Sequence, residues 1–329
     1  RIAHANLYYQ RMGRHDVSRQ SIFFEPNIWL KGNAWEIKAK MNSEFPDLTT
    51  MVNYRDDSNP MNIILGNTQL RNIHYYDIEG GKTFEGKKHS RLNINTGYHQ
   101  TDNAVAYSLV FDKQTGVSTV QPISVNGNYR IDLGIGYTRP LDKKEKLSID
   151  NQASFNYNHN VDMAMVQGTT QSQRSIVNNW KISNVLKLNY RPDDNYEFTL
   201  HGGGTYYLIK SQREGFSNIH AGDYNIGMNA QITLPWKLQL TTDLTMFARR
   251  GYQLSEMNTT DWIWNAQLSR SFINKKLLVK LQGFDMLRQL SNTQYLMNAQ
   301  GRTETWNNSI PRYVMLSLSW RFNVNPKKK

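Results

Sequence analysis

Hydrophobic and polar residues alternate at every second position over long stretches of the chain. Between residues 223 and 234 the apolar positions are Tyr224, Ile226, Met228, Ala230, Ile232 and Leu234, and the polar or small ones between them are Asp223, Asn225, Gly227, Asn229, Gln231 and Thr233. Successive side chains of a β-strand point to opposite faces, so this stretch predicts a strand with one apolar and one polar face. The same alternation appears at 129–137, 147–157, 180–190, 196–208, 237–246, 277–284 and 313–322. Since no comparable stretch has helical spacing, the sequence predicts an all-β protein.

The predicted strands are long. Most have about ten residues or more, whereas strands of soluble proteins average about five or six and a tilted membrane-spanning strand needs about nine to eleven. We expect about thirteen of them, at 21–30, 34–43, 72–83, 90–112, 125–139, 147–160, 176–190, 196–210, 222–234, 237–250, 261–272, 276–288 and 312–322. A fourteenth is expected at Asn6–Met12, and within 90–112 the residues Thr101, Asp102 and Asn103 form either a bulge or a turn. A sheet that spans a membrane must pair all of its backbone, so these strands are expected to close into an antiparallel transmembrane barrel.

The connections between the strands alternate in length. Short polar turns are expected at 140–146, 191–195, 235–236 and 274–276, and longer polar segments at 113–124, 161–175, 211–221, 251–260 and 289–311. Short turns on one side and long loops on the other are typical of outer-membrane barrels, where the short turns face the periplasm and the long loops face the exterior. The sequence therefore predicts a protein of the bacterial outer membrane.

Aromatic residues fall near both ends of the predicted strands. Beside the short turns lie Tyr137, Tyr190, Tyr196, Trp236, Phe272 and Trp320. Tyr and Trp favour the two boundaries between lipid and water, so these residues are expected to form a lipid-interface girdle. The alternative is that aromatic residues simply favour strands.

Composition narrows the possibilities further. Hydrophobic residues make up 39% of the 329 residues and aromatic residues 12%, and there is no cysteine. This polar balance suits either a soluble chain or a barrel that shows lipid only every second residue. The net charge of +12 is spread along the chain, with a basic end at Lys327, Lys328 and Lys329. We expect no nucleic-acid partner, and we divide the chain into a barrel at 1–322 and a basic tail at 323–329.

The sequence contains none of the motifs that we sought for catalysis. Its eight histidines are dispersed, and there is no metalloprotease helix, nucleophile elbow or phosphate-binding loop. We therefore expect no enzyme, no cofactor and no metal centre. One loop is rich in oxygen ligands, with Asp56, Asp57, Asn59, Pro60, Gly66 and Asn67. Such residues suit calcium, but they also build turns for local reasons, and the EF-hand spacing is absent.

This loop also carries a family resemblance. The residues Arg55-Asp56-Asp57-Ser58-Asn59-Pro60, followed by Leu65-Gly66-Asn67 and Leu70, resemble a recurring loop of the outer membrane β-barrel proteins of Bacteroidetes, which are related to TonB-dependent receptors. The stretches Phe111-Asp112-Lys113-Gln114-Thr115-Gly116-Val117 and Leu316-Ser317-Leu318-Ser319-Trp320-Arg321-Phe322 are also similar to that family. The resemblance implies an N-terminal plug and a larger barrel of up to about 22 strands. The chain is then the C-terminal portion of a longer receptor.

Two functions remain open at this point. The first is uptake of a nutrient across the outer membrane, with outer-membrane lipid as surroundings and TonB as a partner reached through N-terminal sequence. The second is a non-conducting scaffold barrel within an assembly that contains other outer-membrane subunits or surface lipoproteins. In both, the loop residues Asp56 to Asn67 are either structural or contact a ligand or partner. A third reading, a soluble all-β binding protein, is the weakest of the three.

Overall fold

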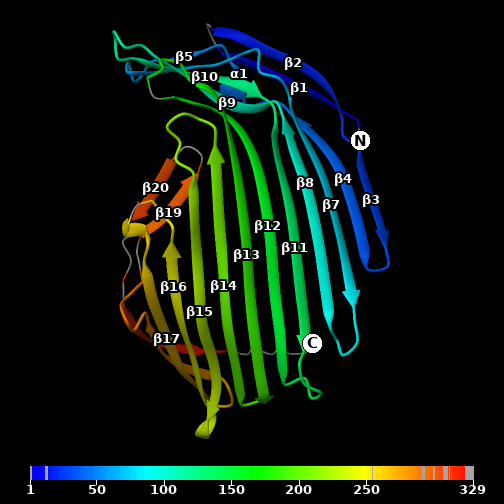
Figure 1. The fold of residues 1–329 in the computed structure, drawn as a ribbon, viewed down its shortest axis with the longest axis vertical. Coiled ribbons are helices and arrows are strands. Elements are labelled where there is room, and N and C mark those ends of the chain that lie inside the picture. Colours follow the sequence, from blue (N-terminus) through cyan, green and yellow to red (C-terminus); the bar gives the residue numbers. More distant parts are fainter. Residues whose placement is uncertain are drawn as a thin grey trace, which may run out of the picture.

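A large antiparallel sheet dominates the fold in the computed structural model, which describes residues 2–11, 14–166, 168–253, 255–290, 293–298, 301–306, 310 and 312–322. Thirteen strands form this sheet, in the order β21-β18-β17-β16-β15-β14-β13-β12-β11-β8-β7-β4-β3. Their bounds are β3 Asn27–Gly32, β4 Trp35–Glu44, β7 Ile73–Glu85, β8 Arg91–Asp102, β11 Asn128–Pro140, β12 Leu147–Ala164, β13 Gln173–Asp193, β14 Tyr196–Ser211, β15 Ile219–Leu234, β16 Leu238–Arg250, β17 Thr260–Phe272, β18 Leu277–Phe284 and β21 Tyr313–Trp320. Figure 1 shows them side by side in one curved wall. The predicted all-β, antiparallel class is confirmed.

The remaining strands form three small sheets. β1 (Ile2–Arg11) pairs with β2 (Arg14–Phe24), and β19 (Thr293–Asn298) pairs with β20 (Gly301–Trp306). The third, here called the rim sheet, has the order β5-β6-β10-β9. Its strands are β5 Arg55–Asp56, β6 Asn62–Leu65, β9 Ala104–Phe111 and β10 Ser118–Val125, and α1 (Leu48–Met51) precedes them.

The connections of the large sheet alternate strictly between short and long. Each of the turns β3–β4, β7–β8, β11–β12, β13–β14, β15–β16 and β17–β18 is short, and η1 (Pro235–Lys237) forms one of them. The connections between these hairpins are long, and one of them contains η2 (Ser255–Met257). The rim sheet and α1 lie at the loop end, where the long connections gather (Figure 1). The predicted asymmetry therefore extends along the whole large sheet.

Strand registers give the large sheet an apolar face and a polar face. Ile226 of β15 lies opposite Gly202 of β14 and Met246 of β16, and its neighbour Asn225 lies opposite Gly203 and Phe247. Ile226 and Met228 on the apolar face are 50% and 49% exposed. Within the part of the chain that the structure describes, no second layer covers them, as a soluble sheet would require.

The buried apolar residues gather at the loop end. One cluster contains Val177, Ile209, Ile219 and Ala221, with Phe216 and Tyr252 packed against it. A second joins the rim sheet to β12 through Ala106, Val125 and Val161. Along most of their length, both faces of the described long strands therefore lack a packed core. Only the ends of the strands beside the loops contact one.

Several predicted strands differ from the observed ones. The expected strand 21–30 ends at Phe24 in β2 and restarts at Asn27 in β3, because Pro26 lacks the N–H that a continuing ladder needs. The expected strand 90–112 is two strands, since Asn103 adopts a φ of 56° and turns the chain into the rim sheet. The expected loop 113–124 contains most of β10, and 289–311 contains β19 and β20.

The expected fourteenth wall strand also lies elsewhere. Asn6–Met12 falls mainly in β1, which pairs with β2 and not with the large sheet. Met12 and the predicted tail 323–329 lie outside the described residues. Within the described part of the chain, the edge strands β3 and β21 do not pair with each other, so the expected closure is not made there. Among these residues no helix has the length and apolarity to cross a membrane.

Candidate functional site on the polar face of the sheet

A row of ionisable side chains crosses four strands on the polar face. Lys40 Nζ of β4 lies 3.4 Å from Asp77 Oδ2 of β7, and Asp77 Oδ1 lies 2.6 Å from His99 Nδ1 of β8. His99 Nε2 lies 3.4 Å from Asp132 Oδ2 of β11, which also accepts a hydrogen bond from Arg130 Nε at 2.6 Å. We call these five residues the polar ladder.

The register explains why the ladder forms. Lys40 pairs with Asp77, Asp77 with His99, and His99 with Arg130, so the side chains stand in one cross-strand row. Cross-strand neighbours of opposite charge stabilise a sheet, and the three central side chains, Asp77, His99 and Asp132, are partly shielded from water. His99 and Asp77 are 22% and 19% exposed, respectively. The row extends to β12, where Asn156 Nδ2 donates to Asp132 Oδ1 at 2.5 Å.

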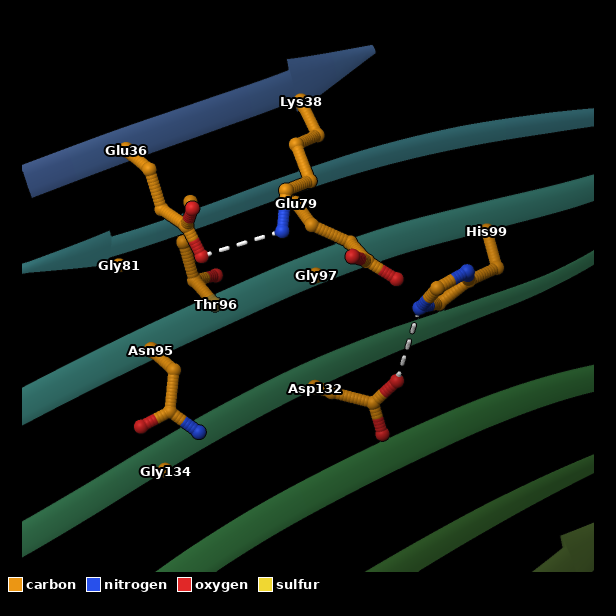
Figure 2. A pocket seen from close by; sticks show the side chains of 11 residues that line it. Glu36, Lys38, Glu79, Gly81, Asn95, Thr96, Gly97, His99, Asp132 and Gly134 are labelled. Atoms are coloured by element: carbon orange, nitrogen blue, oxygen red, sulfur yellow. Dashed lines mark hydrogen bonds and ion pairs between the residues drawn. The ribbon is translucent and has the colours of Figure 1, made fainter. Parts of the chain in front are cut away.

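Beside the ladder the wall is hollowed over β4, β7, β8 and β11. This wall hollow encloses ≈ 280 Å³, and its polar side chains include Glu36, Lys38, Glu79, Asn95, His99 and Asp132. In Figure 2 these side chains converge from neighbouring strands on one space, with Lys38 bonded to Glu36 and His99 paired with Asp132.

Glycines form the floor of the wall hollow. A Cβ at Gly97 would lie 2.9 Å from His99 Nε2, and one at Gly134 would lie 2.5 Å from Asn95 Nδ2. The side chains of His99 and Asn95 therefore each lie flat across a glycine. The wall stays smooth there and still presents hydrogen-bond donors and acceptors. The hollow therefore offers a polar group both hydrogen-bond donors and hydrogen-bond acceptors.

The described residues give no sign of a metal centre, because no group of three or more His, Asp or Glu side chains among them has the geometry to hold an ion. The rim-loop oxygens instead serve the backbone. Asp56 Oδ1 accepts from Ser58 N at 3.1 Å, and Asn59 Oδ1 accepts from Met61 N at 3.1 Å. The hydrogen bonds from Ser58 lower the pKa of Asp56 below its ordinary value. Asp57 pairs with Arg55 at 3.4 Å, and Pro60 follows Asn59 in the turn.

Gly66 and Asn67 tie this loop to its surroundings. A Cβ at Gly66 would lie 1.7 Å from the Val52 carbonyl oxygen, so only glycine fits there. Asn67 Nδ2 donates to the Pro122 carbonyl at 2.8 Å, and Asn67 Oδ1 accepts from Gln69 N at 2.9 Å. The six predicted loop residues thus lie along one segment of the rim sheet, and none of them lines the wall hollow.

The predicted girdle residues lie at the turn end of the apolar face or in a turn. Tyr190 pairs with Phe198 and Leu147, and Phe272 and Trp320 both flank Leu277. Trp236 stands in a turn with a φ of 62° and is 79% exposed. Tyr137 and Tyr196 occupy the same face of β11 and β14. Their contact with a lipid interface stays a prediction.

A second row of rings crosses the apolar face nearer the loop end. Ring centroids are separated by 6.1 Å for Tyr98 and Tyr129, 5.8 Å for Tyr129 and Tyr157, and 5.1 Å for Tyr157 and Trp180. These residues come from four adjacent strands. A continuous belt of this kind matches the aromatic rows that flank the apolar band of outer-membrane barrels.

The polar ladder and the wall hollow are features that sequence reasoning did not identify. The available signal was that Lys40, Asp77, His99 and Asp132 all fall on polar positions of the alternation. That signal predicts on which face of its strand each side chain lies. It does not predict the register between neighbouring strands, and the register places the four side chains in one row.

Comparisons with known proteins agree with this architecture. A model of the outer membrane protein beta-barrel family matches residues 166–320, from just before β13 to the end of β21. A mutant of the ferric enterobactin receptor of Pseudomonas aeruginosa has a similar structure, with a TM-score of 0.54 at 12% identity, over 89% of this chain and 45% of that chain. A second mutant of that receptor, in complex with enterobactin, gives 0.49 at 13% identity, over 89% and 46%. A search of the curated proteins found no match.

These findings define the class of protein. The chain has an outer-membrane β-barrel fold, and its location is the bacterial outer membrane, as the alternation and the loop asymmetry predicted. It spans less than half of the length of the receptors to which it is similar.

Proposed function

We propose that the chain forms part of the wall of an outer-membrane transporter that takes up a nutrient. The observation that carries this proposal is the polar face with its ladder from Lys40 to Arg130. When one face of a sheet contacts lipid, a row of charged side chains on the other face is stable only if that face contacts water, a solute or protein. Such a row is stable when it faces a water-filled lumen.

Closure of the barrel is part of the same proposal. The edges β3 and β21 expose unpaired backbone in the described chain, and a lipid-exposed edge is costly in a membrane. We infer that further strands complete the wall, giving a barrel of up to about 22 strands. In the energised version a plug from N-terminal sequence gates the lumen and TonB drives it, as the resemblance to the Bacteroidetes family implies. No enzymatic role is part of this proposal.

The proposal is tested with the complete protein in planar bilayers and in cells. With the plug deleted, we expect stepwise single-channel conductance, and we expect the intact protein to support uptake that depends on the inner-membrane energy supply. A complete gene that encodes neither a plug nor a TonB-contacting segment would refute the energised version. A plug-deleted barrel without conductance would refute transport altogether.

The rival proposal is a scaffold, and one feature of the rim sheet supports it. Met61, Tyr107 and Val110 are exposed apolar side chains on strands or turns at the loop end, where a protein partner has access. In the scaffold proposal these side chains contact that partner. Stoichiometric co-purification with another outer-membrane subunit or a surface lipoprotein, together with absence of conductance, would favour the scaffold.

A further inference from the structure

The short turns of the large sheet are rich in lysine. They contain eight lysines, two in the β7–β8 turn, three in β11–β12, one in β15–β16 and two in β17–β18, but only three acidic residues. The long connections of the same sheet contain seven Lys or Arg residues and eight acidic ones. In an outer-membrane barrel the short turns face the periplasm. The excess of positive charge in the connections therefore lies at the periplasmic end of the wall.

Two of these turns lie together, as Figure 1 shows for the hairpins β7–β8 and β11–β12. His89 Nδ1 in the first turn lies 2.5 Å from Glu145 Oε1 in the second. Arg91, at the start of β8, pairs with Thr138, near the end of β11. Five of the eight lysines belong to these two turns. We call residues 82–91 and 137–146 the basic turn patch.

The acidic side chains of the basic turn patch already have partners. Glu145 is paired with the histidine of the other turn, and Glu85 Oε1 lies 3.5 Å from Arg91 Nη2. Asp142 Oδ1 accepts a hydrogen bond from Leu147 N at 2.8 Å, which lowers the pKa of Asp142. By contrast, several cations of the patch make no ion pair within the described part of the chain, namely Lys82, Lys87, Lys88, Arg139, Lys143 and Lys144.

Two of these cations lie on the apolar face of the wall. The register places Arg139 opposite Ile149 and Lys82 opposite Ile94. Lys82 Nζ also lies 4.6 Å from the centre of the Phe84 ring. At the turn end of the described wall strands, no acidic residue occupies an apolar-face position. Because this face contacts lipid in the proposed barrel, the counter-charge for both cations has to come from the lipid headgroups.

We propose that the basic turn patch binds the headgroups of acidic phospholipids in the periplasmic leaflet. Lys82 and Arg139 contact the phosphate from the apolar face, and the turn lysines contact it from the aqueous side. Phe84 and Tyr137 lie at the boundary between the two. Aromatic residues at a membrane boundary, together with clustered Lys and Arg, are a common basis for recognition of anionic lipid.

A soluble acidic partner fits the patch less well, because it would not reach cations on the apolar face. The inference goes beyond the proposed transport function. It concerns lipid on the outside of the wall and holds equally for a transporter and for a scaffold.

The test uses the complete protein in phosphatidylcholine vesicles with a trace of spin-labelled lipid. Electron spin resonance measures the fraction of labelled lipid that the protein surface immobilises. At low ionic strength we expect labelled phosphatidylglycerol to associate about twofold more strongly than labelled phosphatidylcholine, averaged over the whole surface. High salt should reduce this preference because it screens the charges.

Variants locate the preference on the wall. Lys87→Gln/Lys88→Gln and Arg139→Gln should each bring the association of the two lipids closer to equal. Arg71→Gln/Lys113→Gln, which removes two exposed charges at the loop end, is the matched control and should keep the preference of the wild type. Heat-modifiable migration on gels confirms that each variant is folded.

Three results would overturn the proposal. Equal association of both lipids with the folded wild type would leave the patch to a soluble acidic partner. An equally large loss in Lys275→Gln/Lys276→Gln, in the β17–β18 turn, would mean that the general charge of the turn end attracts the lipid. Loss of the preference when inorganic phosphate replaces chloride at equal ionic strength would mean that the patch binds free phosphate.

Discussion

Gly66 stands where the rim sheet passes closest to the segment after α1. The backbone of Gly66 donates to the Tyr54 carbonyl at 3.0 Å while the Val52 carbonyl fills the place of a side chain. Leu70, 1% exposed, is buried a few residues further on, and the Arg19 guanidinium donates to its carbonyl. At the residue scale, the loop from Asp56 to Asn67 is therefore an ordered element in which the side chains of Asp56, Asn59 and Asn67 support backbone turns or a neighbouring segment.

Replacement of Gly66 should disorder the rim sheet locally. In Gly66→Ala the new Cβ collides with the Val52 carbonyl oxygen, and overpacking of this kind typically costs about 1–3 kcal/mol. Hydrogen exchange measured by mass spectrometry should show faster exchange across 48–65 with the large sheet unchanged. Gly80→Ala is the control, because its Cβ would meet nothing nearer than 3.7 Å. Equal exchange in both variants would refute the packing role of Gly66.

The polar ladder makes a second prediction at this scale. His99→Ala leaves Asp77 and Asp132 without their shared neighbour, and since both are only partly exposed the loss should be about 1 kcal/mol in the free energy of unfolding. His89→Ala removes a histidine that pairs with Glu145 at 2.5 Å in an exposed turn, and should change stability far less. Urea unfolding in lipid vesicles measures both. A larger loss for His89→Ala would contradict the ladder as a stabilising unit.

Long hairpins are the units of the wall at the scale of elements. The alternation at every second position predicted most of these strands because each strand has one polar and one apolar face. The register between β15 and β16 places Ile226 beside Met246. Asn151 and Asn184 are polar residues on apolar-face positions, and each amide bonds to the other, at 3.1 and 3.2 Å. The pairing satisfies two groups that would otherwise face lipid unpaired.

Charge placed on the two faces of β15 should have opposite consequences. Ile226→Arg puts a cation on the apolar face near the middle of the strand, where the cost in a bilayer is about 2–4 kcal/mol. Asn225→Arg puts the same charge on the polar face, where water or polar groups solvate it. Folding yield and urea midpoint in vesicles should fall for Ile226→Arg alone. A comparable loss in both variants would argue against a lipid-facing side.

The sequence predicted the strands better than it predicted their partners. Within 90–112 the sequence left a bulge or a turn open at Thr101, Asp102 and Asn103, and the structure has the turn, at which Asn103 leads the chain out of the wall. The parallel pairing of β10 with β6 joins segments far apart in the chain, and no local pattern encodes it. For the same reason the loop residues around Asp56 were identifiable from their types, while the polar ladder required the register of three strand pairs.

At the scale of the whole molecule, the described residues combine three features: an antiparallel wall of thirteen strands whose edges do not pair with each other, a polar face that carries charge, and packed apolar clusters at the loop end. A wall with two uncovered faces is stable only if lipid covers the apolar one. The transport that we propose depends on this arrangement.

A single-cysteine scan along β15 tests that arrangement most directly. The chain has no cysteine, so one introduced in turn at each position from Tyr224 to Gln231 carries a spin label without background. In vesicles, labels at Tyr224, Ile226, Met228 and Ala230 should collide mainly with oxygen dissolved in lipid, and labels at Asn225, Gly227, Asn229 and Gln231 mainly with a water-soluble nickel chelate. A period of two in these collision rates is the predicted result. Equal access of the nickel chelate to all eight positions would contradict the account.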